Sequence, residues 1–272
     1  MRERNINSWA GVLLVGVVVL YAAALLVAPI LALLSGAFSD GIAPVLDALT
    51  TPDALAALRL TTILAISAAL INALLGLICA WVLVRHEFPG RRFFNALVDL
   101  PFVVSPVIVG YVMIVLFGRL GWLKDFPIQL AFSTEGMLLV TVFVSLPFVI
   151  REVQPTLAAL AKEQEEAAYT LGASQWLTFR RIIFPTIRHA LTYGVVLTLA
   201  RALGEFGAIA VIGGGVRGVT ETATIYVYRS MHDRNPIGAY SMAVLLGLIA
   251  VSILVIMNWL RPNPRKGHSD VN

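Results

Sequence analysis

Long apolar stretches, separated by short polar segments, dominate this sequence. A helix needs about 20 apolar residues to cross the roughly 30 Å hydrocarbon core of a bilayer. The stretches are continuous and do not alternate apolar with polar positions, as the strands of a membrane barrel would. The pattern therefore predicts an all-α integral membrane protein with about six transmembrane helices. They are expected at about Trp9–Leu34, Leu60–Val84, Ala96–Phe117, Gly136–Val149 with a further turn, Ala190–Ile212 and Ala239–Leu260.

The composition agrees with this class of protein. Of the 272 residues, 58% are hydrophobic and only 13% are charged, which lies outside the range of water-soluble domains. We expect a single transmembrane domain over residues 1–272. Two connections are long, at 151–189 and 213–238. Long loops in a compact membrane domain tend to carry function.

The net charge is +4, and the distribution of the basic residues along the chain indicates what this charge means for the protein. Six crossings place both termini on one side of the membrane. If that side is the cytoplasm, thirteen of the 20 Lys and Arg residues lie on the inner side and six lie in the outer loops. This bias predicts a multi-pass protein of the cytoplasmic membrane with both termini inside. It indicates membrane lipid as a partner, and not nucleic acid.

The sequence lacks the motifs of the common catalytic and metal sites. It contains no Gly-Lys dipeptide, so it has no phosphate-binding loop of the P-loop ATPases. His86 and Glu87 begin like a zinc protease motif, but the second histidine is missing. The lone cysteine, Cys79, falls within an apolar stretch. We therefore expect neither an enzyme nor a metal or cofactor site in this chain.

The polar segment 151–189 contains a spaced motif, Glu-Ala-Ala, then three residues, Gly, nine residues, and Ile-x-Phe-Pro. Its principal residues are Glu166, Ala167, Ala168, Gly172, Ile182 and Pro185. Pro155 suits a helix start, Ser174 can cap a second short helix, and Pro185 is expected to stop it. The predicted shape is a helix–turn–helix.

Three interpretations of this segment compete. A DNA-binding helix–turn–helix would need a dense basic face, which is absent, and this segment is tethered at both ends to membrane helices. An amphipathic loop lying on the bilayer is the structural alternative. Docking to a soluble partner fits the residue types better, because the two alanines allow close approach and Gly172 permits a turn.

The spacing of the motif resembles the cytoplasmic loop by which the membrane subunits of bacterial ABC importers grip their ATPase subunits. Phe184 stands where that pattern usually has leucine, which is a conservative change. Two segments are similar to the sulfate and molybdate class of these permease subunits, Asp99–Gly110 and Arg201–Ala208. A third, Gly213–Thr222, is similar to the W-type subunit of the bacterial sulfate/thiosulfate importer.

This resemblance implies a type I ABC importer permease fold and a set of partners. A second homologous permease subunit would complete a heterodimer, and two copies of a cytoplasmic ABC ATPase would dock on the loops. Those ATPases would use ATP and Mg, and an extracytoplasmic sulfate-binding protein would deliver the anion. Two alternatives stay open: a molybdate or tungstate permease of the same class, and an ATPase-independent secondary oxyanion transporter.

Arg201, Glu205, Ser105 and Pro106 are the candidate residues of a translocation path or gate. Arg201 is expected near the middle of the fifth helix, and Glu205 lies four residues further on, so the two side chains can pair. One interpretation is an internal salt bridge or a link to the partner subunit. The other is that Arg201 adds positive potential to an anion path while Glu205 shapes a gate. Prolines such as Pro106 predict helix kinks or a lining of the path.

Overall fold

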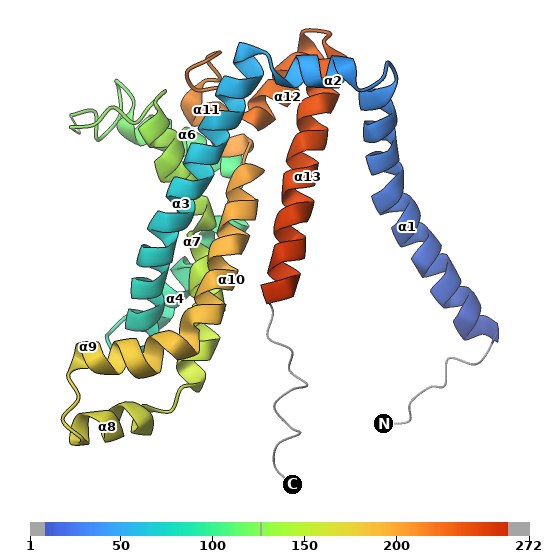
Figure 1. Ribbon diagram of the computed structural model, residues 1–272. Coiled ribbons are helices and arrows are strands. Elements are labelled where there is room, and N and C mark those ends of the chain that lie inside the picture. The colour runs from blue at the N-terminus through green and yellow to red at the C-terminus, as the bar shows by residue number, and fades with distance from the viewer. Residues whose placement is uncertain (1–8, 126, 261–272) are drawn as a thin grey trace.

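The computed structural model describes residues 9–125 and 127–260, and the described residues form helices joined by turns (Figure 1). Five helices are long and apolar enough to span a membrane, and a bent pair makes a sixth span if it is counted as one. The five spans contain α1 (Trp9–Phe38), α3 (Pro52–Arg85), α7 (Thr134–Ala159), α10 (Phe184–Leu203) and α13 (Pro236–Leu260), and the span with α10 starts earlier, at Gln175. The bent span contains α4 (Arg91–Leu97), α5 (Leu100–Val103) and α6 (Pro106–Phe117). The expected all-α membrane fold is confirmed.

Shorter elements lie at the two ends of the bundle. They are α2 (Ala43–Leu49), α8 (Lys162–Thr170), α9 (Gln175–Thr178), the π-helical turn η1 (Phe179–Ile183), α11 (Gly207–Gly213) and α12 (Ala223–His232). Figure 1 places α2, α11 and α12 at one end, and α8 and α9 at the other. The first turn of α1 and the last turn of α13 both point toward the end that holds α8 and α9.

Close packing of α3, α7 and α10 forms the centre of the bundle. Gly76 of α3 lies against Val149 of α7, where an added Cβ would be 2.7 Å from the valine side chain. Gly194 of α10 approaches the same residue, and its Cβ would be 2.9 Å from Val149 Cα. Helices in a membrane associate through this kind of contact, because lipid supplies little hydrophobic drive between them. Small residues therefore set the distances between these three helices.

Buried polar side chains fix the register of α3. Asn72 donates through Nδ2 to the carbonyl of Val142 at 3.1 Å and to Ser145 Oγ at 2.9 Å, both in α7. Nearer the other end of α3, Thr61 Oγ1 accepts a hydrogen bond from the backbone N–H of Ala223 at 2.8 Å. Such interhelical bonds contribute roughly 0.6–2 kcal/mol each in a membrane. They link α3 to α7 and to the start of α12.

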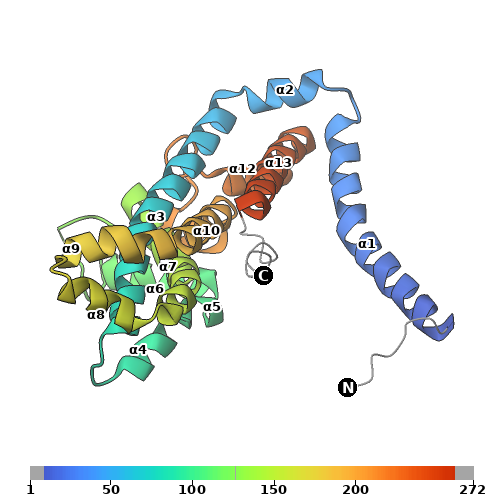
Figure 2. The same cartoon turned by 60° about the horizontal axis from the view of Figure 1, so that its bottom comes forward.

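Helix α1 stands apart from the other helices. It contacts α13 near one end, where a Cβ on Gly36 would lie 2.8 Å from the ring of Tyr240. From there it leans away from the bundle (Figures 1 and 2). Most of its large apolar side chains are exposed. In a membrane this surface must face lipid or another protein.

Two helices that the sequence predicted as continuous are broken. The third bends by 108° between Val103 and Pro106. Proline pushes the preceding residue out of the helical region, and Ser105 accordingly adopts φ −58° and ψ 133°. The fifth ends at Leu203, and α11 begins at Gly207. Both interruptions fall inside apolar stretches, so hydropathy alone does not reveal them.

Conversely, helical structure continues beyond the predicted fourth span and past two prolines that were expected to start or stop a helix. Arg151 lies within α7, and the two carboxylate oxygens of Asp99 accept its hydrogen bonds at 2.7 and 2.6 Å. Pro155 also lies inside α7 and starts no new helix. Pro185 does not stop the second loop helix, since the chain stays helical from Gln175 to Leu203. The π-helical turn η1 before Pro185 accommodates its missing N–H, and the ribbon bends there (Figure 1).

Candidate functional site

The break between α10 and α11 is stabilised by Glu205, whose side chain is buried. Its Oε1 accepts a hydrogen bond from the N–H of Ala208 at 3.1 Å, in the first turn of α11. Its Oε2 lies 2.6 Å from Nη1 of Arg201. Its backbone carbonyl accepts a hydrogen bond from Thr224 Oγ1 at 2.8 Å. A helix break within an apolar segment is tolerated only where the freed backbone groups find such partners.

The broken segments α5–α6 and α10–α11 lie against one another. A Cβ on Gly110 of α6 would be 2.7 Å from the carbonyl oxygen of Ala208. A Cβ on Gly207 of α11 would be 2.9 Å from Cγ2 of Val107. Glycine is needed at both positions because the two backbones approach too closely for a larger residue. The two interruptions are therefore neighbours in space.

A pocket of about 350 Å³ opens at this junction. It is lined by residues 101–106 together with Val144 and Arg201. The structure thus brings Ser105, Pro106 and Arg201 to one cavity, and Glu205 lies behind Arg201 as its ionic partner. The side chain of Arg201 is 31% exposed and that of Glu205 is 2% exposed. Among the pocket's lining residues, Arg201 is the only ionisable group.

The position of Arg201 differs from the sequence prediction in one respect. It was expected near the middle of its helix, but it lies in the last turn of α10. The helix ends there because Gly204 and Glu205 leave the helical path. Arg201 and Glu205 do form the internal ion pair that their spacing allowed.

The segment expected to dock a soluble partner forms two short helices and a turn. Glu166 and Ala167 are exposed in α8, and Ala168 is half-buried. Gly172 adopts φ +81° with open space where a Cβ would be, so it permits the turn as expected. The expected cap of the second helix is confirmed, because Ser174 Oγ accepts a hydrogen bond from the N–H of Leu177 at 3.3 Å.

The other two motif residues lie at the N-terminal end of α10. Ile182 is half-buried in η1, and Pro185 is exposed in the first turn of α10. Between them and α8, the ring of Phe179 stacks on Trp176 with centroids 5.8 Å apart, and it meets Trp81 of α3 at 6.1 Å. The loop is therefore attached to the membrane helices through an aromatic cluster. Its tip carries exposed apolar side chains, Leu171 and Trp176, at 88% and 69% exposure.

Sequence analysis missed a buried ion pair under this loop. Arg85, the last residue of α3, pairs with Glu165 of α8, and the two side chains are only 9% and 12% exposed. Arg85 Nη2 also donates to the carbonyl of Leu160 at 3.2 Å, just after α7. One arginine thus ties α3, α7 and α8 together. Glu165 is adjacent to the motif residue Glu166, and sequence alone does not tell which of the two faces inward.

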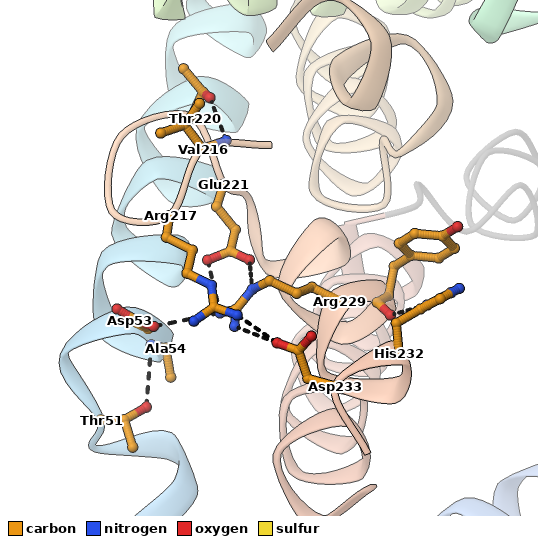
Figure 3. A network of polar contacts seen from close by, with 11 residues as sticks. Thr51, Asp53, Ala54, Val216, Arg217, Thr220, Glu221, Arg229, His232 and Asp233 are labelled. Carbon is orange, nitrogen blue, oxygen red and sulfur yellow. Dashed lines mark hydrogen bonds and ion pairs between the residues drawn. The ribbon is translucent and has the colours of Figure 1, made fainter. Parts of the chain in front are cut away.

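A second missed cluster lies at the opposite end of the bundle, around Arg229 of α12 (Figure 3). Arg229 binds both carboxylate oxygens of Glu221, which is buried, with Nη2 to Oε2 at 3.0 Å. It also lies 3.3 Å from Asp233 and 3.6 Å from Asp53 of α3. The hydrogen bonds to Glu221 raise the pKa of Arg229 above its usual value. The cluster fixes α12 to the first turn of α3.

The buried pair predicts different outcomes for two adjacent glutamates. Glu165→Gln leaves Arg85 with an uncompensated buried charge, so α8 should detach and trypsin should cleave after Lys162 roughly 10-fold faster or more. Glu166→Gln is the matched control, since Glu166 is exposed, and cleavage should stay at the wild-type rate. Limited proteolysis of the detergent-solubilised protein measures both. Equal rates in the two variants would show that the ion pair does not hold α8.

Comparisons with known proteins agree with this architecture. Residues 72–266 match the family described as "Binding-protein-dependent transport system inner membrane component". The chain is 42% identical over 262 residues to the sulfate transport system permease protein CysW of Escherichia coli strain K12, covering 95% of this chain and 90% of that protein. It is 36% identical over 258 residues to the sulfate transport system permease protein CysT of Synechocystis sp., covering 93% and 90%.

Solved structures show the same fold at low sequence identity. A chain of a bacterial alginate ABC transporter, crystallised with its periplasmic protein, superposes with a TM-score of 0.78 at 15% identity, and the match covers 93% of both chains. The fold is therefore that of ABC importer permeases, and the protein is a multi-pass membrane protein. Since the family match extends over most of the sequence, the chain belongs to the inner membrane component family of binding-protein-dependent transport systems.

Proposed function

We propose that this chain is the membrane subunit of an ATP-driven importer that carries sulfate or thiosulfate across the bacterial cytoplasmic membrane. The observation that carries the proposal is Arg201, a cation at the wall of a pocket where two broken helices meet. The identity with sulfate permeases supports the choice of anion. The anion passes by non-covalent binding alone, so the chain needs no catalytic residue and no cofactor.

The pocket suits a weak and transient anion site. Arg201 has five N–H donors, so pairing with Glu205 leaves donors for an oxyanion. Ser105 adds a hydroxyl, and the first turn of the 12-residue helix α6 begins at Pro106 on the same cavity, where the helix dipole favours negative charge. Glu205 offsets the charge of Arg201 when no anion is present. Binding therefore stays weak enough for release, as conduction requires.

A second, homologous permease subunit completes the path. The pocket lies on one chain and is open, so a facing subunit is needed to enclose the anion. The two names CysW and CysT among the relatives support a heterodimer of related permeases. The exposed surface of α1 supplies a further contact for that partner. Each subunit then contributes one transmembrane domain, here residues 1–272, with its docking loop at about 151–189.

Two copies of a cytoplasmic ABC ATPase, which use ATP and Mg, dock on the loops of the two permease subunits. On this chain the surface comprises Glu166, Ala167, Ala168, Gly172, Ile182 and Pro185. Leu171 and Trp176 add exposed apolar anchors of the kind that dominate protein interfaces. This surface lies on the cytoplasmic side, and so do both termini. A sulfate-binding protein delivers the anion at the other end of the bundle, near α2 and α12.

A continuous helical stretch connects docking to the pocket. It runs from Gln175 to Leu203, so it begins beside Trp176 in the loop and ends in the turn that carries Arg201. The ion pair of Arg85 with Glu165 couples the same loop to α3. ATP binding would draw the docked loops together and turn the path from inward-facing to outward-facing, and hydrolysis would reset it. No further element is required to transmit the movement.

Sulfate uptake tests the ATP coupling. In cells lacking this chain, wild type should restore uptake of radiolabelled sulfate, whereas Gly172→Asp combined with Glu166→Lys should reduce it about 10-fold or more, because about 1.4 kcal/mol of lost docking energy already produces that factor. Glu87→Lys is the matched control, since Glu87 is exposed and lies outside the docking surface, and uptake should stay at the wild-type level. If the loop variant takes up sulfate at the wild-type rate, the protein would be a secondary carrier. Inhibition by modest molybdate would reassign the anion.

A charge-balanced pair of variants tests the role of Arg201. Arg201→Ala leaves Glu205 buried without its partner, so it should impair both assembly and uptake. Arg201→Ala with Glu205→Gln removes both charges but keeps a side-chain oxygen that can accept the N–H of Ala208, so it should restore assembly, measured by co-purification with the ATPase, without restoring uptake. Normal uptake in the double variant would show that the pair is structural and that Arg201 has no role toward the anion.

A further inference from the structure

A crevice between α3, α4 and α7 carries arginines that the transport path does not use. It lies at the end of the bundle that holds α8, has a volume of about 750 Å³, and is lined by Arg91, Arg92, Arg151, Asn95 and Gln154 among others. No carboxylate is among its lining residues. Two of the arginines come from the first turn of α4. The crevice is therefore positively charged and suited to an anionic ligand.

The three arginines differ in how far they are engaged. Arg151 is occupied by Asp99, Asn95 and Gln154, so it forms the wall of the crevice. Arg91 donates through Nε to the carbonyl of Leu83 at 2.7 Å, which orients the guanidinium and leaves its two amino nitrogens for a ligand. Arg92 is exposed at the rim. Two cations are thus held at a site that the protein itself does not neutralise.

A second crevice continues the first toward the middle of the bundle. It has a volume of about 450 Å³, and it shares Leu83 and Phe88 with the charged crevice. Its other lining residues are Ile78, Cys79 and Val82 of α3, Phe94 and Leu97 of α4, Val98 just after α4, Pro101 of α5, and Phe143 and Leu146 of α7. None of these residues is ionisable apart from the cysteine thiol. The lining is that of a site for a hydrocarbon chain.

We propose that the two crevices together bind one anionic phospholipid, with the headgroup phosphate between Arg91 and Arg92 and an acyl chain along α3 and α4. A free phosphate or sulfate would fill the charged part alone, and a zwitterionic lipid would not need its net positive charge. The site lies at the level where headgroups of one leaflet meet basic helix ends. Placing that leaflet on the cytoplasmic side depends on the proposed orientation, whereas the lipid site itself does not.

The bound lipid would brace α4 against its neighbours. Helix α4 has no buried residue of its own, and it precedes the 108° bend into α6 that forms the pocket at Ser105. An acyl chain beside Leu97 and Val98 fills the space that α4 leaves toward α3 and α7. The lipid therefore supports one of the two broken segments, and Pro101 separates it from the anion pocket, since this residue lines both cavities.

Native mass spectrometry of the delipidated importer complex tests the site. Phosphatidylglycerol should bind at one molecule per copy of this chain, and phosphatidylcholine with the same acyl chains should bind far more weakly. Each arginine is worth about fivefold in affinity, so Arg91→Gln with Arg92→Gln should weaken phosphatidylglycerol binding about 30-fold. Arg92→Gln alone, at an exposed position, should weaken it about fivefold. Arg188→Gln, an exposed arginine outside both crevices, is the matched control and should have no effect.

Three results would overturn the proposal. Equal binding of the two lipids would show that the charge is not recognised. Inorganic phosphate or sulfate that displaces the lipid at millimolar concentration, and binds without it, would identify a free-anion site. Unchanged phosphatidylglycerol binding in Arg92→Gln would place the lipid elsewhere, and this single variant still decides the matter if the double variant fails to assemble.

Discussion

A membrane interior supplies no water to backbone groups, and this constraint governs where the helices of this protein are interrupted. The fifth span breaks only because Glu205 accepts the N–H of Ala208, because Thr224 caps the carbonyl of Glu205, and because Arg201 offsets the carboxylate charge. The third span breaks at Ser105 and Pro106, where it packs on α11 through glycines. Each interruption is tolerated because the other lies beside it. Their common pocket is the consequence.

The same helix that ends at this pocket begins at the docking loop. The chain is helical from Gln175 to Leu203, apart from the bend at η1, so one continuous element joins the loop to the pocket. The Arg85–Glu165 pair and the contact of Trp81 with Phe179 connect the loop to α3 as well. Two attachments of different chemistry, ionic and aromatic, make it difficult for the loop to move independently of the bundle. The loop and the pocket are therefore joined by one helix and by side-chain contacts to α3.

Much of this architecture could be predicted from the sequence, and the exceptions have a common cause. Hydrophobic length predicts the spans, and the side-chain chemistry of Ser174 and Gly172 predicts the loop's cap and turn. Residues whose contacts depend on a partner far away in the sequence could not be predicted: Arg151 pairs with Asp99, and Glu165 faces inward toward Arg85. The break after Leu203 is invisible to hydropathy, since apolar residues continue through α11. Local sequence patterns predict local structure, whereas the partners of the charged residues within the bundle are known only from the tertiary contacts.

The central claim is that the pocket at the two helix breaks is an aqueous path for the anion. It is tested most directly by Ser105→Cys in a Cys79→Ala background, where the new thiol is the only cysteine of this chain, and labelling is read on this chain after the subunits are separated. In the assembled importer, a membrane-impermeant thiol reagent should label this position from the cytoplasmic side without nucleotide and from the outer side with ATP trapped, and sulfate should slow both reactions. A thiol that stays unreactive from both sides, while Glu87→Cys in the same background is labelled at its exposed position, would contradict the account.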